Sequence, residues 1–469
     1  MRAVLTRDEM RAADAAALAD VSHETLVTRA GTAVAMVALR ILGGGYGRRV
    51  LVVAGKGSNG ADGQVAAGVL ARRGARVTVL HAADAPDELP PCDLVIDGAY
   101  GTGFKGSYDA PIAPAGIPVL AIDIPSGVDA DSGDASGTAV RADRTVTFAA
   151  LKPGLLQGDG PACSGAIEVA DIGITFPTPA ALVVEDADLA ALPRRVRDGN
   201  KWNHAVGIAA GSPGMEGAAI LSTRGAMAGG AGMIRLGSPG DPVAGWPVEA
   251  VRMHLPGSGW AGAFLEAAAK CKAIVIGPGL GTDEETADEI RAVVAAAPVP
   301  VVIDADALTA LGDKASARTL LDKRSAPSIL TPHDGEYARI AGAPPGPDRL
   351  AAARALAEST GAIVLLKGPL TAVAAPGAGG STSAGAARPD VLLSVAGVPA
   401  LATAGSGDVL SGVIGAFCAR GEAAHRAAAL GAHAHGRAAA LGPVEGLVAG
   451  DLPELVGRVL SSALPRGCV

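Results

Sequence analysis

Short apolar runs rich in β-branched residues alternate along this chain with Ala-rich segments of helical length. In the first half, the pattern predicts strands at 48–54, 76–80, 93–97, 117–123 and 145–149. In the second half, it predicts strands at 273–277, 299–304, 327–330, 362–366 and 371–375. Continuous apolar strands separated by helices are typical of parallel sheets that are covered on both faces. We therefore expect an α/β fold with two doubly wound parallel sheets.

The expected boundary between the two sheets lies in segment 177–200, which carries Pro, Asp and Arg without a sustained core period. A chain of 469 residues is also longer than one hydrophobic core usually organises. We therefore predict two domains, 1–195 and 196–469. A Gly/Ser/Ala-rich segment, 376–390, has the composition of a loop.

Composition narrows the class of protein further. Apolar residues make up 49% of the chain and charged residues 18%, which is typical of globular proteins. With 47 acidic and 39 basic residues the net charge is −8, so small molecules are better candidate partners than nucleic acid.

The N-terminus is charged and apolar runs are short, so we expect a cytoplasmic protein without a membrane partner. Five cysteines without a CxxC pair predict reduced thiols.

Open parallel sheets bind ligands beyond the carboxyl ends of their strands, and a glycine-rich segment, 55–63, follows the first predicted strand there. It satisfies GxGxxG and opens an apparent helix at 63–74, whose N-terminal N–H groups could hold a phosphate. A glycine-lined packing turn would give the same pattern. The next predicted strand, 76–80, also lacks the terminal acidic residue that a dinucleotide-binding site typically contains.

Polar residues at three strand ends of the first half are expected to meet at one rim: Asn59, Asp97, Asp123 and Ser126. Their carbonyl, carboxylate and hydroxyl oxygens suit a hard cation, and the low formal charge favours a monovalent one. Each Asp could instead be a helix cap.

These motifs, Gly55–Gly63, DGAYGTG from Asp97 and DIPSGVD from Asp123, resemble the YjeF N-terminal domain, the NAD(P)H-hydrate epimerase family. The resemblance covers about residues 1–195 and implies a Rossmann-like fold and a potassium ion held by Asn59, Asp97 and Ser126. It implies that the hydrated nicotinamide nucleotide is lined by Ser58, Asn59, Gly60, Ala61, Asp62, Gly101, Thr102, Gly103, Phe104, Lys105, Gly106, Ser107 and Asp123. From its position and residue type, we assign Asp123 the catalytic proton transfer.

The first half departs from the family pattern at three places. Ser58 stands where the family usually has Asn, and Ala61 stands where it has Gly. The upstream segment 26–31, with Thr28, also differs. If these changes disable the site, the chain would be a nucleotide sensor or scaffold rather than an enzyme.

In the second half, the strongest signal is segment 402–412, ATAGSGDVLSG, in which small residues open a helix with Asp408 in its first turn. Backbone N–H groups at such a turn bind phosphate oxygens, and Asp408 is placed to take a proton from a substrate hydroxyl. The alternative is a first-turn charge without a catalytic role. Lys367 ends a predicted strand before a tight turn and suits nucleotide contacts, unless it is an exposed hairpin lysine.

Further polar strand ends in this half carry GPGLG at 277–281, DADA at 304–307 and TPHDGE at 331–336. His333 in the last of these is expected to contact a ligand, with a core histidine as the alternative. His433 and His435 are spaced as HxH inside a predicted helix, 423–441. An i, i+2 pair faces opposite sides of a helix, so joint metal ligation is not expected.

Together these motifs resemble the ribokinase-like fold and, more narrowly, the YjeF C-terminal domain, the ADP-dependent NAD(P)H-hydrate dehydratase family. The resemblance covers about residues 200–440. It implies that the hydrate contacts Ala218, Gly281, His333 and the catalytic Asp408, and that Mg²⁺ assists. It implies that the adenine nucleotide contacts Lys367, Gly368, Pro369, Leu370, Thr371 and Gly407. Met215 and Glu216 depart from the family at one wall of this site.

The two resemblances imply a metabolite-repair enzyme that epimerises the R and S hydrates of NADH and NADPH and dehydrates the S form. ADP is the expected co-substrate, with NAD(P)H, AMP and phosphate as products, and a homo-oligomer is a family expectation. The alternative is a ribokinase-like small-molecule kinase fused to a non-catalytic nucleotide-binding domain.

Overall fold

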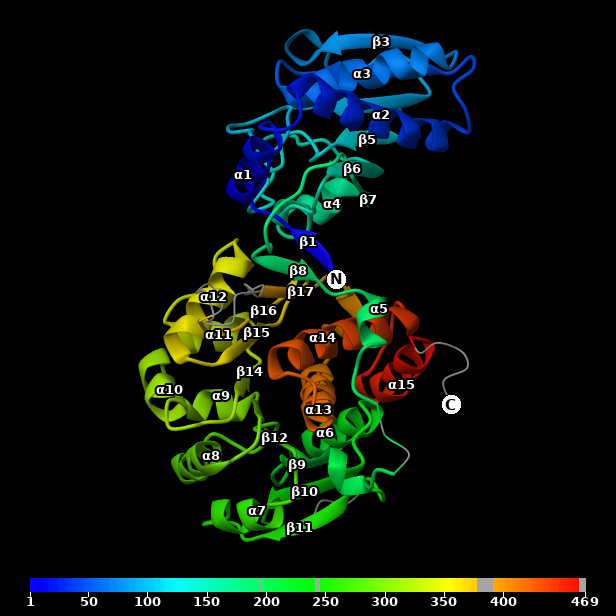
Figure 1. Ribbon diagram of the computed structural model, residues 1–469. Helices are drawn as coiled ribbons and strands as arrows, with labels where there is room; N and C mark the ends of the chain where they lie inside the picture. Colours follow the sequence, from blue (N-terminus) through cyan, green and yellow to red (C-terminus); the bar gives the residue numbers. More distant parts are fainter. Residues whose placement is uncertain (195, 197, 241–244, 378–390, 464–469) are drawn as a thin grey trace. The chain divides into compact units, whose positions relative to one another are not determined.

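The computed structural model describes the chain except residues 195, 197, 241–244, 378–390 and 464–469 (Figure 1). Most of the predicted loop 376–390 therefore lies outside the described residues. The chain forms two compact units, Arg2–Ala180 and Ala181–Val469, the latter together with Met1.

The border between the units falls at 180/181, fifteen residues before the border expected from the sequence. The reason is a short strand, β8 (Ala181–Val183), which pairs in parallel with β17 (Val391–Ser394). Leu189 and Leu192, which follow β8, are buried in the core of the second unit. Strand pairing and core packing thus assign 181–195 to the second unit.

The first unit contains a six-stranded parallel sheet in the order β3-β2-β4-β5-β6-β7. Its strands are β2 (Arg49–Ala54), β3 (Arg76–His81), β4 (Leu94–Gly98), β5 (Val119–Ile122), β6 (Arg144–Phe148) and β7 (Ala166–Ala170). The first five match the predicted strands. The sequence did not predict β7, a half-exposed edge strand whose Glu168 interrupts the apolar run. A further short strand, β1 (Arg2–Val4), precedes them.

Helices α2 (His23–Leu42) and α3 (Ser58–Arg72) lie side by side over one face of this sheet (Figure 1). Among the described residues, α2 is long and apolar enough by composition to cross a membrane. Its side chains at Leu26, Val34 and Leu42 are nevertheless buried in the core of the unit. Two shorter helices are α1 (Arg7–Ala17) and α4 (Gly160–Ser164).

The second unit is built on a sheet whose ten strands from this unit follow the order β8-β17-β16-β15-β14-β13-β12-β9-β10-β11. Besides β8 and β17, these are β9 (Ala205–Ala209), β10 (Met233–Pro239), β11 (Val251–Leu255), β12 (Ala273–Ile276), β13 (Val301–Ile303), β14 (Ser328–Leu330), β15 (Ile363–Leu366) and β16 (Thr371–Ala374). Strands β12 to β16 match the five predicted ones. The sequence missed β8 to β11 and β17, several of which contain Gly, Arg or His.

One strand departs from the predicted parallel arrangement. β16 runs antiparallel to both β15 and β17, because residues 367–370 form a tight turn that leaves no room for a crossover helix. The other strands of this unit pair in parallel. The second sheet is therefore mixed at one end.

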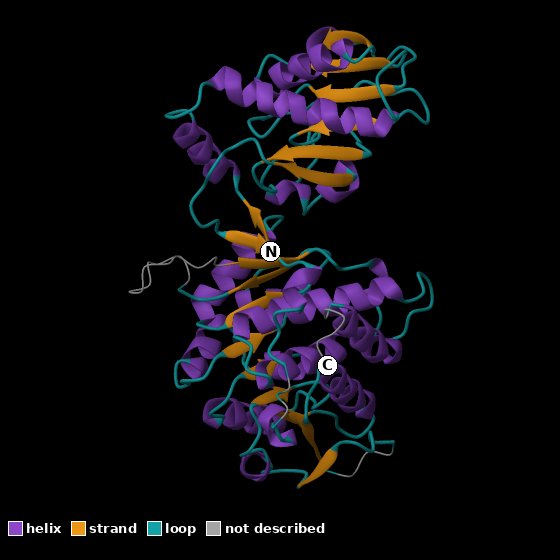
Figure 2. Cartoon of the chain, turned by 45° about the vertical axis from the view of Figure 1, so that its right-hand side comes forward, coloured by secondary structure: helices purple, strands orange, loops and turns teal. Residues whose placement is uncertain are grey.

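Helices cover both faces of the second sheet (Figure 2). They are α5 (Asp186–Leu189), α6 (Glu216–Ala228), α7 (Ala261–Ala267), α8 (Glu284–Ala296), α9 (Asp306–Ala310), α10 (Lys314–Leu321), α11 (Asp334–Ala341), α12 (Arg349–Thr360), α13 (Ser406–Ala419), α14 (Ala424–Leu441) and α15 (Leu452–Ser462). α13 is buried along most of its length and packs closely against α6. This packing fixes the helix that carries Asp408.

Candidate functional site

A cavity of about 260 Å³ opens in the first unit where strand ends meet α1, α2 and α3. Its lining includes Met10, Asp14, His23, Leu26, Ser58, Asn59, Asp62, Thr102, Asp123, Phe148 and Lys152. Five of the residues expected from the sequence therefore face one space: Ser58, Asn59, Asp62, Thr102 and Asp123.

Asp123 follows β5 and adopts a left-handed backbone conformation with φ of 66°, which is strained for a residue with a side chain. Its Oδ1 accepts hydrogen bonds from Lys152 Nζ at 2.6 Å and from Thr147 Oγ1 at 3.0 Å. Lys152 is only 1% exposed and also donates to the Phe148 carbonyl at 3.0 Å. The structure thus holds Asp123 as the carboxylate of a buried ion pair that faces the cavity.

Two further carboxyl groups line the same cavity. Burial raises the pKa of Asp62 to about 8, with a further contribution from the negative charge of Asp123. Burial also raises the pKa of Asp14, again assisted by Asp123. At neutral pH, Asp62 therefore holds a proton while Asp123 is paired with an ammonium group. A protonated carboxyl group and an ion-paired carboxylate in one cavity can serve as an acid and a base.

The three residues expected to hold a cation come together around the backbone of Tyr100. The Tyr100 carbonyl accepts from Asn59 Nδ2 at 3.0 Å and from Ser126 Oγ at 3.2 Å. Ser126 also donates to Asp97 through Oγ at 2.7 Å and through its backbone N–H at 2.8 Å. This places carboxylate, hydroxyl, amide and carbonyl oxygens within one small region.

The buried carboxyl group of Asp97 is a reason to expect a cation in this region. The residue is 3% exposed, and burial raises the pKa of its carboxyl group. The hydrogen bonds described for it come from neutral donors, on Ser126 and Ala99. A buried carboxylate held by neutral donors is costly, and a weakly charged cation would offset that cost. The described residues contain no cluster of three His, Cys, Asp or Glu side chains suited to a transition metal.

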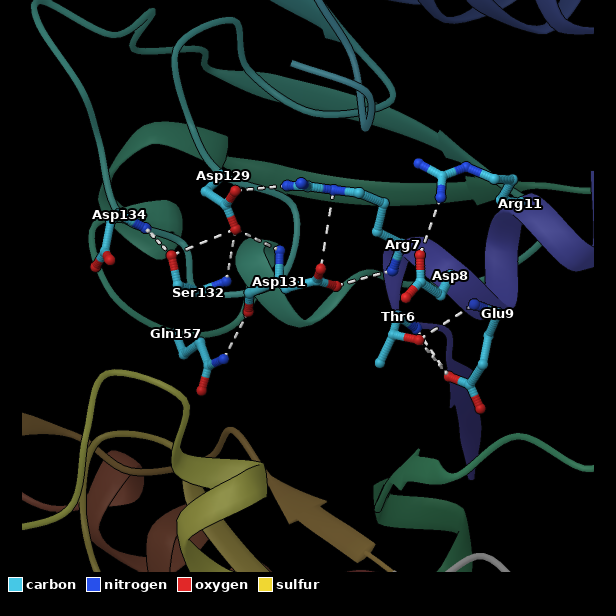
Figure 3. A network of polar contacts seen from close by, with 10 residues as sticks. All are labelled: Thr6, Arg7, Asp8, Glu9, Arg11, Asp129, Asp131, Ser132, Asp134 and Gln157. Carbon is cyan, nitrogen blue, oxygen red and sulfur yellow. Dashed lines mark hydrogen bonds and ion pairs between the residues drawn. The ribbon is translucent and has the colours of Figure 1, made fainter. Parts of the chain in front are cut away.

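Helix α1 is fixed at its start by a capping box. Thr6 accepts from the Glu9 backbone N–H at 3.2 Å, and Glu9 accepts from the Thr6 backbone N–H at 2.9 Å (Figure 3). These reciprocal bonds satisfy N–H groups that the first helical turn leaves free. The helix contributes Met10 and Asp14 to the cavity.

Arg7 ties α1 to the loop that carries the DIPSGVD motif (Figure 3). Its guanidinium contacts Asp129 Oδ2 at 2.5 Å, and its backbone N–H donates to Asp131 Oδ1 at 2.8 Å. Asp129 in turn accepts from the backbone N–H groups of Asp131 and Ser132. No local pattern pointed to Arg7, because its partners lie more than 120 residues away.

The other residues expected near the first site are not part of the lining of this cavity. Gly60 packs so tightly that an added Cβ would lie 1.9 Å from the Gly55 carbonyl oxygen. The predicted helix 63–74 begins earlier, at Ser58, so Gly60 and Ala61 are in its first turns. Of segment 101–107, Thr102 is the residue that lines the cavity, while the others are outside its lining: Gly101, Gly103, Phe104, Lys105, Gly106 and Ser107.

A larger cavity of about 780 Å³ lies in the second unit, between strand ends and the start of α13. Its lining includes Asp304, His333, Glu336, Lys367, Gly368, Pro369, Thr371, Val398, Pro399, Gly405, Ser406, Gly407, Asp408 and His435. Most of the residues expected from the sequence are among them.

Lys367 and Asp304 form an ion pair in this cavity. Lys367 Nζ lies 3.0 Å from Asp304 Oδ1 and 3.6 Å from Glu336 Oε2. Asp304 is 1% exposed and also accepts from Ser411 Oγ at 2.6 Å. Burial alone would raise the pKa of Asp304, but Lys367 and the hydrogen bond from Ser411 outweigh it and lower this pKa. Asp304 and Glu336 lie in the noted DADA and TPHDGE segments, but the sequence did not assign either a role.

Asp408 lies in the first turn of α13, next to this ion pair. Burial raises its pKa to about 7, and the negative charge of Asp304 contributes to the rise. Gly405 caps the helix in the left-handed conformation with φ of 84°, which favours glycine. A carboxyl group with a pKa near neutrality is suited to accept a proton from a substrate.

His333 caps α11 rather than lying in the core. Its Nδ1 accepts from the backbone N–H groups of Gly335 at 3.0 Å and Glu336 at 3.3 Å. In return, the Glu336 side chain accepts from the His333 backbone N–H at 2.9 Å. This arrangement leaves Nε2 as the protonated ring nitrogen, on a side chain that lines the cavity.

Three predicted contacts lie outside the lining of this cavity: Ala218, Gly281 and Leu370. Gly281 donates its N–H to Asp306 Oδ2 at 2.9 Å, and Leu370 is buried. Ala218 lies against the GPGLG turn, where a Cβ on Gly279 would be 3.0 Å from its own Cβ. These three residues therefore do not face the cavity directly.

His433 and His435 on α14 face different surroundings, as their spacing predicted. His433 Nε2 contacts Asp186 Oδ1 at 2.9 Å, whereas His435 lines the cavity. Metal binding was the only role that the spacing of these two histidines suggested. His435 was therefore not predicted as a residue of the site.

Comparisons with known proteins agree with this two-part architecture. A family model described as NAD(P)H-hydrate dehydratase matches residues 206–461, and one described as YjeF-related protein N-terminus matches 23–88 and 82–154. The bifunctional NAD(P)H-hydrate repair enzyme Nnr of Mycobacterium leprae (strain TN) is 38% identical and covers 96% of each chain.

Two solved structures each match about three fifths of this chain. A ribokinase-like superfamily protein from Enterococcus faecalis V583 covers 62% of this chain and 99% of its own, with 21% identity and a TM-score of 0.51. An ADP/ATP-dependent NAD(P)H-hydrate dehydratase from Bacillus subtilis, co-crystallised with ATP/Mg²⁺, is 29% identical with a TM-score of 0.48 and covers 60% of this chain and 97% of its own. The first of these supports the ribokinase-like fold.

Proposed function

The chain belongs to the family of bifunctional NAD(P)H-hydrate repair enzymes, and from that premise we propose that its two units catalyse two successive reactions. The first unit interconverts the R and S hydrates of NADH and NADPH. The second dehydrates the S hydrate with ADP and yields NAD(P)H, AMP and phosphate. The observation that carries this proposal is a separate cavity in each unit, each with a carboxyl group whose pKa is raised to near neutrality or above.

In the first cavity the chemistry concerns the carbon that bears both a hydroxyl group and the ring nitrogen. Asp62 donates its proton to the leaving hydroxyl, and the nitrogen lone pair forms a planar iminium ion as the C–O bond breaks. The Asp123 carboxylate stabilises this cation and accepts a proton from the water that adds to the other face. Lys152 fixes the position of Asp123 during both steps.

A potassium ion is proposed for the region formed by Asn59, Asp97 and Ser126. The support is the buried Asp97 carboxylate with its neutral partners and the oxygen-only donor set. The ion would offset the Asp97 charge and stiffen the DIPSGVD loop. Epimerisation should therefore increase with potassium and be indifferent to zinc chelators. Loss of activity on zinc removal, without any response to potassium, would contradict this site.

In the second cavity Asp408 takes the proton of the substrate hydroxyl, whose oxygen then attacks the terminal phosphorus of ADP. AMP leaves, and the nitrogen lone pair expels phosphate to give an iminium ion. Transfer of a proton from the adjacent ring carbon to the departing phosphate then restores the dihydronicotinamide ring. Backbone N–H groups of the turn 405–407 and Lys367 hold the phosphate oxygens. Mg²⁺ would be held by the phosphates with carboxylates such as Glu336, and would neutralise charge on the transferring phosphoryl group.

The rival proposal is a small-molecule kinase fused to a non-catalytic domain. Incubating the purified chain with ADP and the hydrate mixture, while following dihydronicotinamide absorbance, separates the two. We expect absorbance to rise until both hydrates are consumed. A rise that stops when the S form is exhausted would leave the first unit without epimerase activity, and no rise at all would favour the kinase.

We further propose that the protein acts in the cytoplasm as a homo-oligomer on small-molecule substrates. The acidic net charge and the buried face of α2 support a cytoplasmic location. Size-exclusion chromatography with light scattering tests the oligomeric state directly.

A further inference from the structure

His435 is a cavity residue for which the two proposed reactions leave no role. It lies on α14 and is 5% exposed, yet it is part of the lining of the cavity in the second unit. Its Nε2 is buried and has no hydrogen-bond partner among the described residues. A buried polar atom without a partner is costly, so a partner supplied by a ligand would stabilise the bound state.

The position of His435 within the cavity indicates which part of a ligand it meets. The cavity is lined by the turn 405–407 and Lys367, which suit phosphate. It is also lined by the apolar Val398 and Pro399, which suit the face of a base. His435 lies next to the turn, because its ring interacts with the Ser406 backbone.

Close packing of α14 brings His435 to this place. A Cβ on the next residue, Gly436, would lie 2.6 Å from the backbone of Ala396, so only glycine allows the helix to approach this closely. Ala396 directly precedes the segment that carries Val398 and Pro399. The helix therefore brings His435 close both to the turn at Ser406 and to the segment that begins at Ala396. A nucleotide with its phosphates at the turn and its base on Val398 and Pro399 would have its sugar between them.

We propose that His435 hydrogen-bonds through its imidazole to a ribose hydroxyl of the nucleoside diphosphate bound in this cavity. This inference rests on the proposed ADP-dependent function and adds a residue that recognises the sugar. A hydroxyl group can donate or accept, so it suits either tautomer of the neutral ring. Burial lowers the pKa of His435 to about 4, so the ring is neutral at physiological pH and gains little from contact with a phosphate.

The test compares ADP, 2′-deoxy-ADP and 3′-deoxy-ADP as co-substrates for the wild-type chain and for His435→Leu. For the wild type, removal of the recognised hydroxyl should raise KM about two- to tenfold, the usual range for one hydrogen bond. In His435→Leu, ADP itself should show the raised KM, and the discrimination between the nucleotides should disappear. Such a cycle isolates the contact between ring and hydroxyl.

His433→Leu is a matched control. It lies two residues away on the same helix, is equally buried at 5% exposure, and contacts Asp186 instead of the cavity. We expect this variant to unfold more easily while it keeps the wild-type discrimination between ADP and the deoxynucleotides. His435→Gln, which keeps a hydrogen-bonding group, should recover part of the discrimination.

The inference is wrong if the wild type uses all three nucleotides equally, or if His435→Leu keeps the wild-type discrimination. Equal use of the three nucleotides by the wild type overturns the inference even when a variant fails to fold, and His435→Gln replaces His435→Leu in the cycle in that case. If the wild type forms no dihydronicotinamide at all, the proposed function fails. Calorimetric binding of the three nucleotides to the wild type then still tests sugar recognition.

Discussion

Asp408 can be tested at the scale of a single residue, because Asp408→Asn removes the proposed base while keeping the size of the side chain. We expect ADP-dependent restoration of dihydronicotinamide to fall by about 10²–10⁴-fold, with nucleotide affinity nearly unchanged. Epimerisation in the same preparation is the internal control and should stay at the wild-type rate. Near-normal dehydration by Asp408→Asn would rule out Asp408 as the base.

The pH dependence of dehydration should report Asp408 as well. Because the base must be unprotonated and its pKa is raised to about 7, kcat/KM should rise with pH through about 7. Asp304→Asn removes a negative neighbour, so the pKa of Asp408 should fall and the rise should move to lower pH. A pH–rate profile of both proteins measures this shift, and an unmoved profile would contradict the assignment.

The same raised pKa has a consequence for stability. Between about pH 4 and pH 7 the folded state keeps the Asp408 proton while the unfolded state has lost it, so stability falls as pH rises through this window. Asp408→Asn should therefore flatten the dependence of stability on pH there. Urea unfolding at pH 5 and pH 7.5, for wild type and variant, measures the difference. An identical slope for both would show that Asp408 titrates normally.

Lys152 compensates the buried charge of Asp123 in the first unit. Lys152→Met keeps the length of the side chain but leaves Asp123 without its cationic partner, which typically costs about 3–5 kcal/mol. Thermal unfolding of the first unit should show this loss, and epimerisation should fall. The double variant Lys152→Met with Asp123→Asn should regain stability, because the uncompensated charge is gone. It should not regain activity, because the proposed catalytic carboxylate is gone as well. A double variant no more stable than Lys152→Met would contradict this account.

At the scale of elements, the crossing of α6 and α13 positions the proposed phosphate site. A Cβ on Gly412 would lie 2.0 Å from the Ser222 carbonyl oxygen, and one on Gly225 would lie 2.2 Å from that of Val409. Reciprocal glycines let the two helices touch backbone to backbone. The turn of α13 that carries Asp408 is held in place by this contact.

Gly412→Ala should therefore force the helices apart. We expect a loss of about 1–3 kcal/mol in stability and a clear fall in dehydration, because Asp408 moves with α13. Gly217→Ala is the matched control, since this exposed position on α6 has nothing within 4 Å of an added Cβ. It should stabilise the helix by about 0.4–1 kcal/mol and leave activity unchanged. Chemical denaturation and steady-state assays distinguish the two.

At the scale of the whole molecule, the border at 180/181 predicts which fragments fold. Fragments 1–180 and 181–469 should each unfold cooperatively, whereas 196–469 should be less stable because it lacks β8, Leu189 and Leu192. Near-UV circular dichroism and thermal melts provide the measurement. If 196–469 is as stable as 181–469, then β8 and the residues that follow it do not contribute to the stability of the second unit.

Much of the architecture could be predicted from the sequence, because ten of the strands are short apolar runs with helical segments between them. The strand-end motif around Asp123 was equally visible, since in parallel sheets the carboxyl ends of neighbouring strands meet at one edge. The glycine-rich start of the helix that carries Asp408 was visible as well. Strands such as β9 and β11 escaped prediction, because Gly, Arg and His interrupt their apolar pattern. The antiparallel direction of β16 depends on a turn of only four residues. The periodicity of apolar residues predicts strands but not their direction.

The sequence by itself predicted the fold class, the two-part organisation and the acid–base roles proposed for Asp123 and Asp408, because these follow from local patterns of apolar runs, glycines and polar residues. Only the tertiary structure decided which charges meet: Lys152 with Asp123, and Lys367 with Asp304 across 63 residues. The raised pKa values of Asp62 and Asp408 follow from burial among those charges. The physical reason is that desolvation and charge pairing depend on distances in space, which chain spacing does not encode.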